Sequence, residues 1–129
     1  EGNQAACTSL ETELKLTNVA KASLEELLID YEDYLRTRSL EQWGVHHTRY
    51  GKMREYARSE QFMNNYATLI KRLNSEEIAN LCITLIHQAI YMLHKLIITM
   101  QERFVTDGGI KERMYQARAN YRSSSKYNK

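Results

Sequence analysis

The sequence contains no proline in 129 residues and only five glycines. A fold of this size built on sheets needs turn residues about every eight to twelve positions, and proline and glycine supply many of them. The sequence therefore predicts helices joined by few loops. Hydrophobic residues make up 43% of the chain and charged residues 26%. This is the composition of one compact soluble domain, not of a disordered or collagen-like chain.

A capping box marks the predicted start of the first long helix. In the segment TSLE, the hydroxyl of Thr8 can accept from the backbone N–H of Glu11, whose carboxylate reaches back to Thr8. From Thr8 to about Arg38 no residue interrupts a helical pattern. Its apolar stripe is predicted to consist of Leu16, Ala20, Ser23, Leu27, Tyr31 and Tyr34, widened by Leu24, Leu28 and Leu35.

The middle of the chain, residues 44–74, is less regular. Its pattern predicts a short helix from Arg49 to Arg58, a joint at Ser59, and a second short helix over 61–72. Trp43 is expected to plug the end of the bundle where the first helix stops.

A second capping box, formed by Asn74 and Glu77, precedes the most apolar helix. This helix is apolar over more than half of its circumference, so it should be central or face another subunit as well as its own core. The pair Gly108-Gly109 is predicted to end it as a left-handed C-cap, and a short last helix over 110–121 should follow. The apolar residues are Ile78, Leu81, Cys82, Leu85, Ile86, Ala89, Met92, Leu93, Leu96, Ile97, Met100 and Phe104.

The stretch Ala79–Met100 is about as long as a membrane span. Polar residues interrupt it, however, and a lysine such as Lys95 at bilayer depth costs about 2.5 to 3.5 kcal/mol. We therefore interpret it as a long core helix and predict no membrane partner. The chain opens EGNQAAC without a basic or apolar leader, so no signal peptide is predicted. Cys7 and Cys82 lack metal-ligand spacing, which favours packing roles and a reducing, cytoplasmic location.

Two segments resemble a known family. The run EGNQAACTSLETELKLTNVAKASLEELLIDYEDYLRTRSLEQW, residues 1–43, resembles the second-helix region of bacterial four-helix-bundle proteins of the 23S rRNA intervening-sequence type. The pattern ANLCITLIHQAIYMLHKLI followed by DGGIKERMYQAR is similar to the C-terminal four-helix-bundle suffix domain. Residues 44–74 match most loosely.

The resemblance implies an all-α, up-and-down four-helix-bundle fold in one domain. In the family a helix precedes the EG dipeptide, so this chain would lack the first helix. Residues 1–43 would then be the second-helix region, residues 44–74 a helical connector, and residues 75–129 the suffix region with a basic tail. The resemblance further implies ring-like homo-oligomers and an association with RNA or with retroelement reverse transcriptases. It implies no enzymatic activity.

Histidines are the first candidate site residues. His87 and His94 lie seven positions apart on one helix face, with Tyr91 between them. The carboxylates of a metal site do not accompany them, so we favour a polar seam of His87, Gln88 and His94. In this seam His87, Gln88 and Tyr91 would hydrogen-bond across the bundle and fix its register. The pair His46-His47 lies between glycines and is interpreted as solvated surface, with metal binding or titration as the alternative.

The sequence offers no pattern typical of catalysis. It contains no GxSxG motif, no Cys/His pairing for nucleophilic attack and no glycine loop that would cradle a phosphate. We therefore predict no enzymatic activity, no metal and no cofactor.

Charge is unevenly distributed along the chain. Residues 110–129 carry six basic side chains and one acidic side chain, a local net charge of +5, which leaves −3 for residues 1–109. On a helix Lys111, Arg118 and Arg122 would share one side. Tyrosines interleave with them, a combination that suits a phosphate backbone with stacked bases. Lys111, Arg113, Arg118 and Arg122 are therefore predicted to bind nucleic acid, and the alternative is a solvated terminal helix.

Tyrosine is the other unusual component, with nine residues against two phenylalanines. Its large ring and hydroxyl suit protein interfaces, although core positions with the hydroxyl at the rim are the more common use. Leu85, Tyr91 and Leu96 are predicted to lie in the core or in an interface. The sequence thus favours a non-enzymatic, self-assembling helical-bundle adaptor associated with RNA or a ribonucleoprotein. The alternative is a purely protein-binding scaffold.

Overall fold

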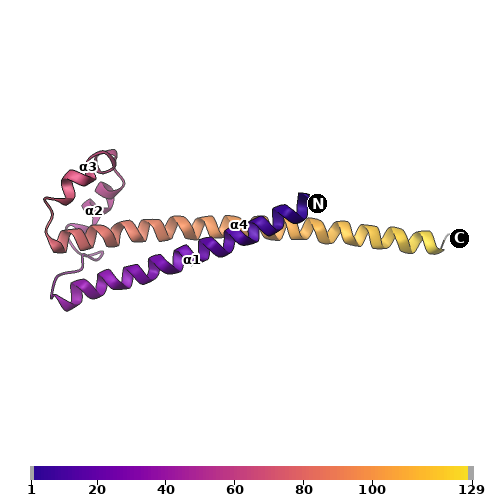
Figure 1. Ribbon diagram of the computed structural model, residues 1–129, viewed down its shortest axis with the longest axis horizontal. Coiled ribbons are helices and arrows are strands. Elements are labelled where there is room, and N and C mark those ends of the chain that lie inside the picture. The colour runs from indigo at the N-terminus through magenta and orange to yellow at the C-terminus, as the bar shows by residue number, and fades with distance from the viewer. Residues whose placement is uncertain (1, 128–129) are drawn as a thin grey trace. The chain divides into compact units, whose positions relative to one another are not determined.

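The computed structural model describes the backbone of residues 2–127 and the side chains of residues 9–106. Over that backbone the regular structure is entirely helical, which confirms the predicted all-α fold of helical-bundle type. The helices are α1 (Gly2–Thr37), α2 (Tyr50–Ala57), α3 (Glu60–Ile70) and α4 (Ser75–Tyr127), drawn in Figure 1. The two long helices α1 and α4 are joined by a segment that contains the two short ones.

The start of α1 differs from the prediction. The helix begins at Gly2, so Thr8 lies inside it and the TSLE segment is not an N-terminal capping box. A capping box stabilises a helix only where backbone N–H groups lack partners, and residues 2–7 contain no proline that would stop the helix. The carboxylate of Glu11 instead lies 3.6 Å from the ammonium of Lys15, one turn further along.

The end of α1 is a Schellman motif centred on Ser39. Ser39 has a φ of +55°, the left-handed conformation that usually requires glycine. Its N–H donates to the carbonyl of Arg36 (3.2 Å), and the N–H of Leu40 donates to the carbonyl of Leu35 (2.9 Å). Leu40 also packs against the core cluster that contains Leu35. The helix therefore ends one residue before the predicted Arg38.

The buried face of α1 agrees with the predicted stripe only in part. The structure confirms the inward positions of Leu24, Leu28, Tyr31, Tyr34 and Leu35. Leu16, Ala20, Ser23 and Leu27 are all exposed. The inward positions instead alternate in steps of four and three residues, the repeat of a coiled-coil seam. Because α1 packs on a single long helix, only this narrow seam is covered, and the wider apolar stripe is not. The seam positions are Leu10, Leu14, Thr17, Lys21, Leu24, Leu28, Tyr31 and Leu35.

The chain divides into two compact units, and each contains part of α1 and part of α4. The first comprises residues 1–18 and 94–129. In it Leu10, Ile97 and Met100 are buried, and the hydroxyl of Thr17 donates to the sulfur of Met100 at 3.8 Å.

The second unit comprises residues 19–93, where the two long helices run antiparallel (Figure 1). Its first core cluster joins Leu35 of α1 to Ala79 and Ile83 of α4. The second cluster joins α2, α3 and α4 through Ala57, Phe62 and Leu81.

The joint between α2 and α3 confirms the predicted break at Ser59. The hydroxyl of Ser59 accepts from the backbone N–H of Phe62 at 3.2 Å, which makes Ser59 the N-cap of α3. The ring of Phe62 meets that of Tyr56 edge-on at 5.7 Å. Both rings belong to the second core cluster, so this cap fixes the angle at which α3 leaves α2.

The start of α4 confirms the second capping box. The N–H of Glu77 donates to Oδ1 of Asn74 at 2.8 Å, and the N–H of Asn74 donates to Oε1 of Glu77 at 3.2 Å. The predicted stop at Gly108-Gly109 is wrong, because α4 continues through both glycines to Tyr127. Each glycine costs only about 1 kcal/mol in a helix interior, and good helix formers follow the pair in the segment KERMYQAR.

The stretch Ser75–Thr106 of α4 is long and apolar enough to cross a membrane by length and composition, a test that core helices of water-soluble proteins also pass. Only 22% of the most apolar 18-residue stretch of this segment is buried. The described part of α4 is therefore not the enclosed core helix that the sequence suggested. Much of its apolar surface is exposed in the single chain.

Candidate functional site

The crossover after α1 is held by a buried amide. Asn80 is only 3% exposed and extends from α4 beneath the segment 41–43. Its Oδ1 accepts from the backbone N–H of Trp43 at 2.7 Å, and its Nδ2 donates to the carbonyls of Glu41 and Glu76, each at 2.9 Å. One side chain thus positions the start of the loop that leads to α2.

Trp43 is buried at this end of the second unit, as predicted. The ring of His47 stacks on it at 5.2 Å, and the guanidinium of Arg49 lies 4.5 Å from the centre of the indole. Arg49 also pairs with Glu77 at the start of α4, at 3.1 Å. The indole nitrogen is buried and has no hydrogen-bond partner among the described residues.

The two adjacent histidines have different environments. His46 is exposed, as expected for solvated surface. The side chain of His47 is only 19% exposed. Its Nδ1 accepts from the N–H of Arg49 at 3.0 Å, and its Nε2 lies 3.5 Å from the carboxylate of Glu41. The prediction of a solvated pair is therefore wrong for His47, because stacking on Trp43 removes it from solvent.

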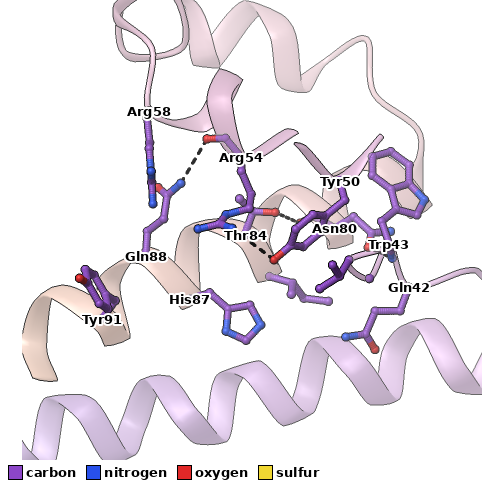
Figure 2. A pocket seen from close by; sticks show the side chains of 13 residues that line it. Gln42, Trp43, Tyr50, Arg54, Arg58, Asn80, Thr84, His87, Gln88 and Tyr91 are labelled. Atoms are coloured by element: carbon purple, nitrogen blue, oxygen red, sulfur yellow. Dashed lines mark hydrogen bonds between the residues drawn. The ribbon is translucent and has the colours of Figure 1, made fainter. Parts of the chain in front are cut away.

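A pocket of about 720 Å³ opens between this loop, α2 and α4 within the second unit. Figure 2 shows Tyr50 and Arg54 on one side of it, with His87 and Gln88 of α4 on the other. Nε2 of Gln88 donates to the backbone carbonyl of Arg54 at 3.4 Å, which ties α4 to α2. The pocket has the size of a small-molecule site. Its remaining lining residues are Gln42, Trp43, Gly44, Val45, Arg58, Asn80, Ile83, Thr84 and Tyr91.

The lining of this pocket is basic and aromatic. It includes two arginines, Arg54 and Arg58, and neither aspartate nor glutamate. The Arg54 guanidinium lies 5.5 Å from the centre of the Tyr50 ring, and its Nη1 donates to the Tyr50 hydroxyl at 3.4 Å. Neither arginine forms an ion pair within the described residues. The pocket can therefore attract an anion without first breaking a salt bridge.

The predicted polar seam is only partly present. Gln88 does bond from α4 to another helix, although its partner is the backbone of α2 and the bond is long. His87 and His94 are exposed, and neither has a hydrogen bond within the described residues. Asn80 instead provides the buried polar link. Burial explains the difference, because a seam fixes register only where water cannot replace its hydrogen bonds.

The predicted core or interface residues fall into two groups. Leu85 is half-buried and packs against the cluster shared by α2, α3 and α4. Tyr91 is 56% exposed and Leu96 is 44% exposed. Exposed apolar side chains on both long helices occur in both units. They are Leu16, Leu96, Ile98, Phe104 and Val105 in the first unit and Val19, Leu27, Ile29, Tyr91 and Met92 in the second.

The described cysteine lies beside a tyrosine between the two long helices. Cys82 is a free thiol, and the hydroxyl of Tyr31 donates to its sulfur. Three causes raise the pKa of Tyr31 above its usual value. The largest is this hydrogen bond, the next is repulsion by a thiolate at Cys82, and the smallest is burial of the hydroxyl. Cys82 is thus partly buried and makes a specific polar contact with Tyr31.

Several predicted residues lie outside the described side chains. Lys111, Arg113, Arg118 and Arg122 fall on the part of α4 for which only the backbone is described. Within residues 9–106 no group of three histidine, cysteine or acidic side chains is placed to hold a metal ion.

Neither Asn80 nor the two arginines of the pocket were predicted from the sequence as site residues. An amide near the start of an otherwise apolar helix was the available signal for Asn80. No sequence pattern places Arg54 and Arg58 in a pocket, because their positions depend on how the loop 38–49 places α2 against α4.

The chain matches no protein-family model, no curated protein and no solved structure.

Proposed function

We propose that this chain is a non-enzymatic, self-assembling helical-bundle adaptor that works in the cytoplasm and associates with RNA or a ribonucleoprotein, in the manner of the 23S rRNA intervening-sequence type. The observation that carries the proposal is the exposed apolar surface of α4. Only 22% of the most apolar 18-residue stretch of this helix is buried. A face of this kind marks a protein–protein or membrane contact.

A second copy of the same chain is the partner that we favour for this face. Both long helices expose large apolar side chains in both units, Leu16 and Leu96 in the first and Val19 and Met92 in the second. Each copy would offer the same kind of surface, which suits the self-complementary contacts of symmetric oligomers. Charged residues among these positions, Lys95 above all, disfavour lipid as the partner.

Paired substitutions test the self-assembly. Leu96→Asp and Val105→Asp place charges on exposed positions of α4, so they should dissociate an oligomer and leave the helix content unchanged. Met63→Asp is the matched control, because Met63 is 69% exposed but lies on α3. The molar mass of each variant would be measured by light scattering at micromolar concentration. Equal masses for all variants would refute this interface.

The proposed association with RNA rests on the charge of the C-terminal segment. Residues 110–129 carry a net charge of +5 on a chain whose remainder carries −3. If Lys111, Arg118 and Arg122 contact phosphates, replacing all three with alanine should make the plot of log RNA affinity against log salt concentration less steep. Its slope should fall in magnitude by about two to three. Equal affinities and slopes for the two proteins would favour the alternative, a scaffold that binds only proteins.

A further inference from the structure

We propose that the pocket between α2, α4 and the loop 42–45 binds a small molecule that combines an aromatic ring with a phosphate group, of the size of a nucleoside monophosphate. This site lies entirely within residues 42–91. It is independent of the proposed RNA association, which rests on residues 110–129.

Two arginines without an ion-pair partner among the described residues would recognise the phosphate. Arg54 and Arg58 are one turn apart at the C-terminal end of α2, and both line the pocket. A guanidinium presents N–H donors in a planar fork that matches the oxygens of a phosphate. No carboxylate lines the pocket, and neither arginine has an ion-pair partner among the described side chains. A phosphate would therefore meet positive charge without competition from a neighbouring acid.

The aromatic part of the ligand is inferred from the other walls. Tyr50 lies on the α2 side, and His87 and Tyr91 project from α4 (Figure 2). Ile83 of α4 also lines the pocket and adds an apolar side chain. Planar rings stack on aromatic side chains and on arginine, and such stacking tolerates many bases. A volume of about 720 Å³ exceeds what inorganic phosphate alone requires and suits a ring with a sugar-sized linker.

A simpler explanation exists for the arginines. Cations at the C-terminal end of a helix interact favourably with its dipole, and Arg54 already lies over Tyr50. This explanation requires no ligand and predicts no saturable binding. The two interpretations therefore differ in a direct titration.

The test titrates the full chain with adenosine monophosphate, adenosine and inorganic phosphate. Binding of each probe is measured by calorimetry or by ligand-observed NMR. We expect saturable binding of adenosine monophosphate and at least about tenfold weaker binding of each of the other two probes, since each lacks one half of the recognised chemistry. Adenosine binding as tightly as its monophosphate would overturn the phosphate assignment. Inorganic phosphate that binds as tightly as adenosine monophosphate would overturn the aromatic assignment. Absence of saturable binding of adenosine monophosphate would overturn the site.

Single substitutions locate the binding. Arg54→Gln and Arg58→Gln should each weaken adenosine monophosphate about tenfold, because each removes a charge-assisted contact. Both residues are exposed, so circular dichroism should show an unchanged fold. The matched control is Arg72→Gln, an exposed arginine after α3 that does not line the pocket. Unchanged affinity in both pocket variants, or equal weakening in the control, would contradict the proposed site.

Discussion

Oδ1 of Asn80 accepts the backbone N–H of Trp43 at 2.7 Å, and this buried contact joins α4 to the loop that follows α1. The same amide donates to the carbonyl of Glu41, so it satisfies two backbone groups of a segment without regular structure. Buried backbone groups outside helices and sheets need such partners, because water does not reach them. The position of the loop, and with it the end wall of the pocket, depends on this side chain.

Replacing Asn80 with alanine should therefore be strongly destabilising. The substitution leaves the N–H of Trp43 buried without an acceptor, which should lower the free energy of unfolding by about 2 to 4 kcal/mol. Asn65→Ala is the control, because Asn65 is exposed on α3 and should change stability by less than about 0.5 kcal/mol. Urea denaturation followed by circular dichroism measures both. A loss below about 1 kcal/mol for Asn80→Ala would show that the contact is not needed.

Ser39→Gly should stabilise the protein. Ser39 holds a φ of +55°, a conformation that glycine adopts without steric cost. The gain in unfolding free energy should be about 0.5 to 1 kcal/mol, whereas Ser39→Val should destabilise by a similar amount or more. Thermal unfolding of the two variants and the wild type checks this order. If glycine and valine have the same effect, α1 does not end in a Schellman motif.

The contact between Tyr31 and Cys82 should make stability depend on pH at the alkaline end. The folded state raises the pKa of Tyr31 above its value of about 10 in the unfolded chain, so the folded state holds this proton more tightly. The resulting stabilisation is fully present below about pH 10 and is lost as the pH rises through the folded pKa. Tyr31→Phe should remove this part of the decline. Urea midpoints of both proteins at about pH 8 and pH 11 would reveal it. Parallel declines would show that the contact does not form.

Leu85→Asp and Leu96→Asp should have different effects, although both leucines belong to the apolar set of α4. Leu85 is half-buried and packs against the cluster of Ala57, Phe62 and Leu81, so a carboxylate placed against this apolar cluster should cost about 2 kcal/mol or more and reduce the helix content of the second unit. Leu96 is 44% exposed, so its replacement should leave the helix content intact. Far-ultraviolet circular dichroism compares the two variants. Equal loss of helicity would mean that Leu96 is enclosed.

Local signals predicted local structure well. The Asn74–Glu77 box and the break at Ser59 were readable because each depends on side chains within four residues. The TSLE segment shows the limit of this approach, since a cap acts only where the helix ends, and α1 continues to Gly2. Gly108-Gly109 shows it again, because a modest local penalty does not stop a helix when good helix formers follow it.

Faces and pockets were less predictable than helices. The stripe containing Leu16 and Leu27 is apolar, yet it is exposed, because α1 has one long neighbour and buries only a narrow seam. The pocket depends on contacts between residues far apart in sequence, such as Gln88 with the carbonyl of Arg54. No periodicity encodes such a contact.

The most direct test of the proposed self-assembly is the molar mass of the wild-type chain in solution. Sedimentation velocity at micromolar concentration should give a discrete oligomer, with a mass that is a whole multiple of the 15.2 kDa chain. Circular dichroism of the same sample should show the high helix content of the structure. A fully helical protein that sediments as a single 15.2 kDa species would contradict the proposal, because the exposed face of α4 would then need no second copy to cover it.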